Sequence, residues 1–359
     1  MAFKFAFVMK MRRFLLACAL AVPVLGLLAW GDGGADAACS AEGDGVPGAE
    51  VRGGSAVAVL SADVPKVYMT RDISADGLVR VFEALGVKPE GRVAVKISTG
   101  EPGGKNFLQP SLIGKLVQRL EGTIVECNTA YGGRRSSTEE HLKAAREHGF
   151  FDIAEVDIMD AEGDLRLAVR DSSHIKYNLV GSHLERYGFM VNLAHFKGHA
   201  MGGFGGVLKN QSIGVASASG KAYIHSAGVT TDVGRMWRHT RDQIGFLESM
   251  AAAAQSVHEY FGGGERIVYI NVMNNMSVDC DCDAHPAAPL LRDVGILASC
   301  DPVALDQACL DIVFSIVPEP GNDNGPLLER IRSRHGTHIV EYAEGIGLGS
   351  RKYELVEME

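Results

Sequence analysis

Basic clusters are missing from this sequence beyond its first residues. The chain of 359 residues carries a formal net charge of −9, and no later stretch concentrates Lys or Arg. Nucleic-acid-binding domains present a basic face, so we expect no nucleic-acid partner. No repeat at a fixed period is present, which argues against a solenoid.

Familiar catalytic signatures are also missing. The sequence contains no G-x-S-x-G turn and no H-E-x-x-H pair. Its glycine-rich stretch matches neither the P-loop nor the dinucleotide fingerprint. Hydrolysis by a common nucleophile is therefore disfavoured, and a bound nucleotide is not implied.

Cysteine is scarce, with seven residues in the whole chain. Their spacing does not resemble the disulfide framework of a small secreted domain, which a chain of this size does not need. Cys280 and Cys282 are separated by one residue, and we expect them not to bridge each other easily.

The N-terminus has the pattern of a targeting segment. Arg12 and Arg13 precede the apolar run FLLACALAVPVLGLLAW, and Ala-Asp-Ala follows at residues 35–37. We predict a signal peptide or membrane anchor over residues 1–37 and a linker over residues 38–54. We expect the protein to be exported by a Sec or twin-arginine signal and to be periplasmic, extracellular or membrane-anchored. Lipidation at Cys39 is an alternative. Membrane contact is expected only through this segment.

Strand and helix patterns alternate over residues 55–359, the expected folded domain. The predicted strands lie near residues 55–60, 66–69, 92–98, 123–128, 165–170, 187–194, 266–273 and 294–299. The predicted helices lie near residues 75–86, 110–120, 137–148, 244–261 and 302–314. Alternation of this kind predicts an α/β fold with a mainly parallel sheet flanked by helices. An arrangement of two α/β lobes with the site between them is the alternative.

Five predicted strands are followed by loops rich in glycine or charge, at residues 99–106, 129–137, 195–210, 274–286 and 300–301. In parallel sheets such loops gather beyond the carboxyl ends of the strands, so we expect one shared ligand site. The loop at residues 195–210, HFKGHAMGGFGGVLKN, ends in a glycine-rich turn that enters a predicted helix. Exposed N–H groups of such a turn and nearby basic side chains bind anions. The candidate anion-binding residues are Lys96, Arg134, Arg135, Gly203, Gly205, Gly206, Lys209 and Asn210. The alternative is a tight turn with solvated basic side chains.

A second stretch, DCDCDAH at residues 279–285, suggests a metal site. Thiolates and imidazoles are suitable ligands for zinc or iron, and the side chains of a C-x-C pair lie on one side of an extended segment. The candidate ligands are His195, His199, Cys280, Cys282 and His285. Ordinary hydrogen bonding within loops is the alternative for the histidines.

Several long blocks carry a resemblance to a known family. They include VAVKISTGEPGGKNFLQP, ECNTAYGGRRSSTEEHLKAAREHGF, HFKGHAMGGFGGVLKNQSIGVASASGK, CDCDAHP and DVGILASCDPVALDQACLDIV. Together they resemble the family called domain of unknown function 362, whose members are often labelled iron–sulfur-centre proteins. Many members carry a cysteine-rich, ferredoxin-like insert, but residues 222–246 of this chain contain no cysteine. Because a cluster normally needs four thiolates, a 4Fe–4S centre is doubtful here.

These observations lead to a ranked set of functions. We expect an exported enzyme or redox protein that binds zinc or iron and acts on a small anionic substrate. A binding protein for a small anionic ligand is the first alternative. A maturation or scaffold factor for another exported redox protein is the second.

Overall fold

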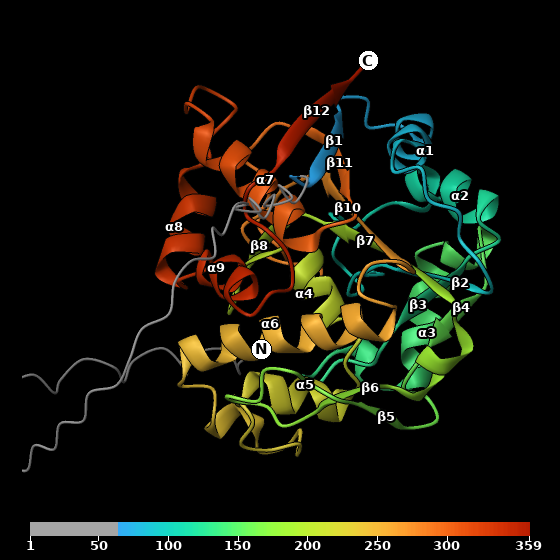
Figure 1. Ribbon diagram of the computed structural model, residues 1–359, viewed down its shortest axis with the longest axis vertical. Helices are drawn as coiled ribbons and strands as arrows, with labels where there is room; N and C mark the ends of the chain where they lie inside the picture. Colours follow the sequence, from blue (N-terminus) through green and yellow to red (C-terminus); the bar gives the residue numbers. More distant parts are fainter. Residues whose placement is uncertain (1–63) are drawn as a thin grey trace, which may run out of the picture. The chain divides into compact units, whose positions relative to one another are not determined.

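An eight-stranded sheet runs through residues 64–359, the part of the chain that the computed structural model describes (Figure 1). In order across the sheet, the strands are β12 (Glu354–Met358), β1 (Lys66–Thr70), β11 (Gly295–Ser299), β10 (Ile267–Met273), β7 (Phe189–His195), β2 (Val93–Lys96), β3 (Thr123–Glu126) and β4 (Val156–Ile158). All neighbouring pairs are parallel except those that include β11, which runs antiparallel to β1 and β10. The predicted mainly parallel α/β fold is confirmed.

Helices cover both faces of the sheet, as Figure 1 shows. One face packs against α1 (Ala75–Ala84), α2 (Pro110–Arg119) and α3 (Thr138–Glu147). The opposite face packs against α4 (Val207–Ser212), α6 (Gln243–Tyr260), α7 (Pro302–Ser315) and α9 (His338–Gly345). Because successive side chains of a strand point to opposite faces, the fully buried strands β2, β7 and β10 contribute to both cores. The described residues thus form one layered unit, without the division into two lobes that we considered.

Four shorter strands lie outside the main sheet. The pair β5 (Asp164–Leu167) and β6 (Asn178–Gly181) is antiparallel, as is the pair β8 (Lys197–His199) and β9 (Gly203–Gly205). Two further helices, α5 (Ala218–His225) and α8 (Gly325–Ser333), pack beside β6 and beside the β8–β9 hairpin respectively. The stretch HFKGHAMGGFGGVLKN therefore forms a hairpin followed directly by α4.

Helix ends agree with the sequence in most places. Asp301 caps α7 by accepting hydrogen bonds from the amides of Val303 and Ala304, as the Asp-Pro pair predicts. Gly86 has a φ of +67° just beyond α1, where its lack of a Cβ permits the left-handed turn. The helix predicted near residues 137–148 is present as α3, and Ser137 lies at its N-cap position without making a side-chain capping hydrogen bond.

Several predictions concern residues 1–63, which lie outside the described part of the chain. These are the signal peptide or anchor, the linker, the strand at residues 55–60 and lipidation at Cys39. Within residues 64–359, no helix is both long enough and apolar enough to cross a membrane.

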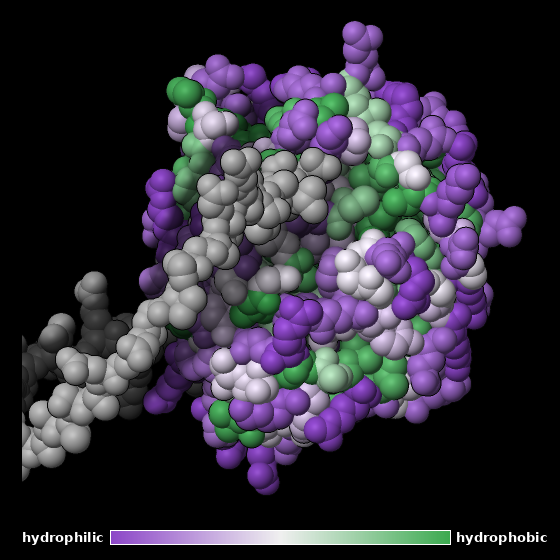
Figure 2. Space-filling model, viewed as in Figure 1, coloured by the Kyte–Doolittle hydropathy of each residue, from purple (hydrophilic) through white to green (hydrophobic). Residues whose placement is uncertain are grey.

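The face of the unit seen in Figure 2 is largely hydrophilic, with hydrophobic residues gathered in several separate areas. The large hydrophobic side chains that are exposed in the described residues are Val64, Val229, Trp237, Ile244, Leu290, Phe314, Val317 and Leu355. Among them Trp237, which is 53% exposed, lies at the wall of a cavity described below.

Candidate functional site

Four of the five polar loops meet at one edge of the sheet. The amide of Glu101, after β2, donates to the carbonyl of Asp281, after β10, at 2.7 Å. The amide of Gly198, after β7, donates to the carbonyl of Ser277 at 2.8 Å. Arg135, after β3, pairs with Glu101 at 3.0 Å. Parallel strands thus gather these loops at their carboxyl ends.

The fifth loop does not belong to this site. Cys300 and Asp301 follow β11, and β11 is the strand that runs against its neighbours. They therefore lie at the opposite edge of the sheet, beside Pro65 and Lys66 at the start of β1. The prediction that all five loops share one site is wrong for this reason.

A cavity of about 530 Å³ opens between the gathered loops. Its walls come from the loops after β2, β3 and β10, from β8 and its turn, and from the region of α5. The lining residues are Glu101, Tyr131, Gly132, Gly133, His199, Ala200, Met201, His225, Trp237, Asp279, Cys280, Cys282, Asp283 and Ala284. A volume of this size is suited to a small molecule.

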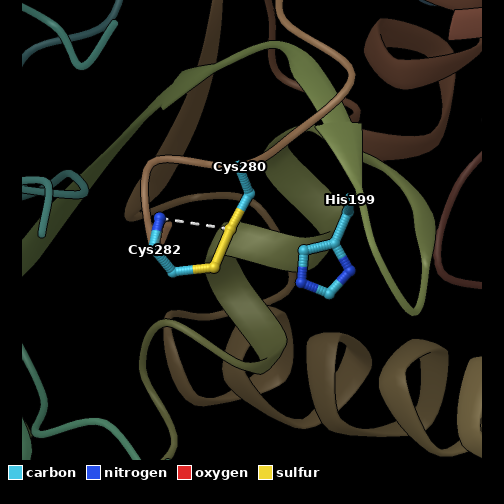
Figure 3. Close-up of side chains that lie close together, drawn as sticks. All are labelled: His199, Cys280 and Cys282. Carbon is cyan, nitrogen blue, oxygen red and sulfur yellow. Dashed lines mark hydrogen bonds between the residues drawn. A yellow bond between two sulfur atoms is a disulfide. The ribbon is translucent and has the colours of Figure 1, made fainter. Parts of the chain in front are cut away.

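Cys280 and Cys282 form a disulfide at the wall of this cavity. The expectation that they do not bridge is wrong, because the backbone turns at this point. The amide of Asp283 donates to the carbonyl of Cys280 at 2.9 Å, and this turn brings the two side chains together. The amide of Cys282 also donates to the Sγ atom of Cys280 at 3.2 Å (Figure 3).

His199 completes a group of three possible metal ligands. One ligand atom from each of His199, Cys280 and Cys282 lies within 4.8 Å of the others, and Figure 3 shows the imidazole facing the disulfide. The Nδ1 atom of His199 accepts a hydrogen bond from the amide of Gly202 at 2.8 Å. Burial lowers the pKa of His199 well below its usual value, and the charges of Lys209 and His225 add to this effect. The ring is therefore neutral near pH 7.

The other two predicted metal ligands lie apart from this group. The Nδ1 atom of His195 is 2.9 Å from Asp281, and its Nε2 atom is 2.6 Å from the carbonyl oxygen of Asn274. Both ring nitrogens thus already face acceptors. His285 is exposed, and its backbone amide donates to Asp283. Among residues 64–359, the group within reach of one metal ion consists of His199, Cys280 and Cys282.

Asp281 lies between the two cysteines and points away from the cavity into a buried ion pair. One carboxylate oxygen lies 2.9 Å from His195 and the other 2.8 Å from Lys197, and all three side chains are almost fully buried. Burial alone would raise the pKa of Asp281, but the charges of Lys197 and His195 outweigh it and hold this pKa below its ordinary value. This ion pair holds the cysteine loop against β8, and no sequence pattern predicts the part that Lys197 plays in it.

The predicted anion cradle at Gly203, Gly205 and Gly206 is filled by the protein itself. The amides of Val207 and Leu208, at the start of α4, both donate to the carboxylate of Asp306 on α7 at 2.9 Å. A Cβ atom at Gly206 would lie 2.2 Å from that carboxylate, so glycine allows the close approach. These amides are therefore not available to an external anion.

Arg134 and Arg135, two of the candidate anion-binding residues, also pair with carboxylates of the protein. Arg134 pairs with Glu140 and Glu147, and Arg135 pairs in the interior with Glu101 and Glu126. Burial would raise the pKa of Glu126, but Arg135 above all holds it well below its usual value. These contacts organise the wall of the cavity and leave neither guanidinium free to hold a ligand.

Lys96 and Asn210 belong to a buried polar network between β2 and α4. The Nζ atom of Lys96 donates to the carbonyl of Ile97 at 2.5 Å and to the side chain of Asn210 at 3.1 Å. Asn210 in turn donates to Asn192 at 2.7 Å. Burial lowers the pKa of Lys96 to about 8, although Glu126, 3.8 Å away, acts in the opposite direction. Both residues therefore have a structural role in this network.

Lys209 differs from the other predicted anion-binding residues. Its ammonium group makes no hydrogen bond or ion pair with any residue of the described part of the chain. Burial, then the charges of Lys197 and Lys96, lower its pKa to about 7. Its charge also acts on His199 and His225, two residues of the cavity wall. Lys209 is thus a cation beside the cavity without a partner in residues 64–359.

Sequence reasoning missed several residues of the site. Tyr131, His225 and Trp237 line the cavity. Tyr131 lies in one of the predicted polar loops but is not among the predicted site residues, and His225 and Trp237 lie outside those loops. Asp306 is one of three aspartates in DPVALDQACLDIV, and no local pattern sets it apart from Asp301 and Asp311. Cys309 is fully buried in α7 and lies away from the cavity.

Comparisons with known proteins extend this description. The chain resembles the lactate racemase apoprotein from Thermoanaerobacterium thermosaccharolyticum, with 14% identity, a TM-score of 0.40, and coverage of 68% of this chain and 56% of that one. It also resembles a protein from Thermotoga maritima, with 15% identity, a TM-score of 0.39, and coverage of 66% and 57%. The chain thus spans a little over half of each of these structures. A search of curated proteins finds no match.

The family comparison is more decisive. Residues 93–311, more than half of the chain, match the model of the domain of unknown function DUF362. This range runs from β2 to α7 and contains all the loops that form the cavity. The chain therefore belongs to the DUF362 family.

Proposed function

We propose that this protein is an enzyme or redox protein that binds zinc or iron at His199, Cys280 and Cys282 and acts on a small anionic molecule in the adjoining cavity. The observation that carries the proposal is the convergence of these three side chains at the cavity wall, although His199, at the end of β8, and Cys280 are 81 positions apart. Two thiolates and an imidazole form a ligand set that suits either metal. A fourth position toward the cavity would be open to substrate.

The donor set fits a metal only in the reduced protein. Thiolates bind zinc and iron, whereas the sulfur atoms of a disulfide are poor ligands, so the Cys280–Cys282 bond must first be reduced. The neutral ring of His199 suits ligation, but its Nδ1 atom now accepts the amide of Gly202. Metal-bound histidines usually donate a proton from the other ring nitrogen, so binding through Nε2 requires a local change at Gly202.

A 4Fe–4S cluster does not fit these residues. Such a cluster normally needs four thiolates. Of the remaining cysteines in residues 64–359, Cys127 and Cys309 are buried elsewhere and Cys300 lies at the opposite edge of the sheet. A single ion, bound when the disulfide is reduced, is the form of metal site that we propose.

Metal analysis of reduced protein tests this proposal. Protein purified and reduced without oxygen should hold about one zinc or iron per chain, and a Cys280→Ser/Cys282→Ser variant should hold none. Cys300→Ser, which changes a cysteine far from the cavity, is the matched control and should keep the metal. Iron would add a visible charge-transfer band. If the reduced wild-type protein binds no metal, the metal proposal is wrong, and the cavity is a ligand-binding site without metal chemistry.

The anionic substrate is proposed from Lys209. Sulfate and oxalate, which keep their charge across neutral pH, should bind the wild-type protein, and Lys209→Gln should weaken binding roughly tenfold or more, the effect of losing one charged hydrogen bond. Because burial together with Lys197, Lys96 and Arg135 lowers the pKa of Lys209 to about 7, with Asp281 opposing them, affinity should fall as the pH rises through that value. Calorimetric titration at several pH values measures both effects. Equal affinities for Lys209→Gln and wild type would contradict this assignment.

Export and a redox partner remain part of the proposal. An oxidising compartment permits the Cys280–Cys282 disulfide, which supports the export that we expect from residues 1–37. An exported redox protein is a suitable partner for a site that alternates between disulfide and dithiol. Separation of periplasmic and cytoplasmic fractions tests the location.

A further inference from the structure

We infer that the Cys280–Cys282 pair is a thiol–disulfide exchange centre that reacts with a small thiol in the cavity. Both cysteines line this cavity, and Cys282 is the less buried of the two. The reaction uses side chains of the proposed metal site but requires no metal. It therefore stands or falls separately from the metal proposal.

The surroundings of the two sulfur atoms differ, and this difference assigns their roles. Cys280 is 4% exposed, and its Sγ atom already accepts a hydrogen bond from the amide of Cys282 at 3.2 Å. An amide that points at a sulfur atom stabilises the negative charge that a departing thiolate carries. Cys280 is thus the leaving group, and the more accessible Cys282 is the sulfur that the incoming thiol attacks.

His199 supplies a second donor at the same place. Since its Nδ1 atom accepts the amide of Gly202, the proton of the neutral ring lies on Nε2. One ring nitrogen of the imidazole lies within 4.8 Å of both sulfur atoms, and Figure 3 shows the imidazole facing the disulfide. Because the ring faces the disulfide, we assign His199 as the catalytic residue that donates this proton to the departing sulfur of Cys280.

The exchange balances in two steps. An external thiolate attacks the Sγ atom of Cys282, a bond forms between the two sulfurs, the Cys280–Cys282 bond breaks, and Cys280 leaves as a thiolate. A second external thiolate then attacks the external sulfur of this mixed disulfide, and the bond from that sulfur to Cys282 breaks. The two external sulfurs leave as a small disulfide, and Cys282 becomes a thiolate. The external thiols lose two electrons, the protein disulfide gains two, and the two protons of the thiols pass to the protein sulfurs or to water.

Trapping with iodoacetamide tests the inference on the full-length protein. The protein is treated with 2-mercaptoethanol in metal-free buffer that contains a chelator and iodoacetamide, and its peptides are analysed by mass spectrometry. We expect reduction of the folded protein, with the mercaptoethanol adduct on Cys282 and the alkyl group on Cys280. Reduction that occurs only after unfolding in urea, or an adduct on Cys280, would overturn the inference.

Two variants sharpen the test. His199→Gln keeps an acceptor for the amide of Gly202 but loses the imidazole N–H, and it should slow reduction roughly tenfold. Cys300→Ser, at the opposite edge of the sheet, should react at the wild-type rate. An unchanged rate in folded His199→Gln would remove His199 from the reaction, and the assignment would fail. Absence of metal in the reduced protein affects only the metal proposal, because no metal is present in this assay.

Discussion

Replacing Asp281 with asparagine is expected to lower the free energy of unfolding by about 3–5 kcal/mol, which is the usual cost of removing one partner from a buried ion pair. The carboxylate contacts Lys197 at 2.8 Å and His195 at 2.9 Å, and all three side chains are almost fully buried. An amide at this position leaves the ammonium of Lys197 without a counterion. Urea denaturation of the two proteins at neutral pH measures the difference.

The pH dependence of this difference has a definite sign. The pKa of Asp281 is lower in the folded protein than in the unfolded chain, so its contribution is fully present above the ordinary pKa of an aspartate, about 4. The contribution is lost as the pH falls below that value, because the unfolded chain then binds the proton more readily. When the pH is lowered from neutral to acid, the free energy of unfolding should therefore fall less for Asp281→Asn than for the wild type.

Asp283 offers a matched control in the same loop. Its side chain is exposed and, among residues 64–359, accepts a hydrogen bond only from the backbone amide of His285. Asp283→Asn should change the free energy of unfolding by no more than about 0.5 kcal/mol. If Asp281→Asn behaves like this control, the ion pair does not hold the cysteine loop in place. Counting of free thiols in both variants checks that the Cys280–Cys282 disulfide has formed.

The sequence predicts the core of this fold well because the signals for it are local. The apolar runs of β2, β7 and β10 and the Asp-Pro start of α7 can be recognised without knowledge of their neighbours. Their alternation with helices predicts parallel strands, and parallel strands predict that polar loops meet at one edge. This reasoning fails for β11. Cys300 would lie at the site only if β11 ran parallel to its neighbours, and β11 runs antiparallel to them. Residues 274–294 contain no helix between β10 and β11, and a connection without a crossover helix favours the antiparallel pairing that is observed.

The details of the site depend on contacts that no local pattern records. Asp281 and Lys197 are 84 positions apart, and the cysteine loop shows its turn only once the chain is folded. The glycines at residues 203–206 do mark a close approach to a carboxylate, as an anion-binding turn would. That carboxylate belongs to Asp306, about 100 positions later, rather than to a ligand. Composition can thus indicate the kind of contact, but not which group provides it.

Asp306→Ala is expected to lower the free energy of unfolding by about 3 kcal/mol, because it leaves three buried donors without an acceptor. These donors are the amides of Val207 and Leu208 and the side-chain amide of Asn271, which lies 2.7 Å from the carboxylate. Since two of them form the first turn of α4, the helix that carries Lys209 should loosen. Urea denaturation measures the loss, and hydrogen exchange of the α4 amides locates it. Asp311→Ala, an exposed position on the same helix α7, is the control and should cost less than about 1 kcal/mol.

The pH dependence of Asp306 has the opposite sign to that of Asp281. Burial raises the pKa of Asp306 to about 6, although the hydrogen bonds from Leu208, Asn271 and Val207 limit the increase. The folded protein therefore holds this proton more tightly than the unfolded chain, and the contribution of Asp306 to stability is largest below pH 4 and declines as the pH rises to about 6. The difference in stability between wild type and Asp306→Ala should accordingly shrink across this range and stay constant above it, whereas the difference for Asp281→Asn should grow as the pH rises from acid. A constant difference for Asp306→Ala would mean that its carboxylate is charged throughout and acts only as a hydrogen-bond acceptor for α4.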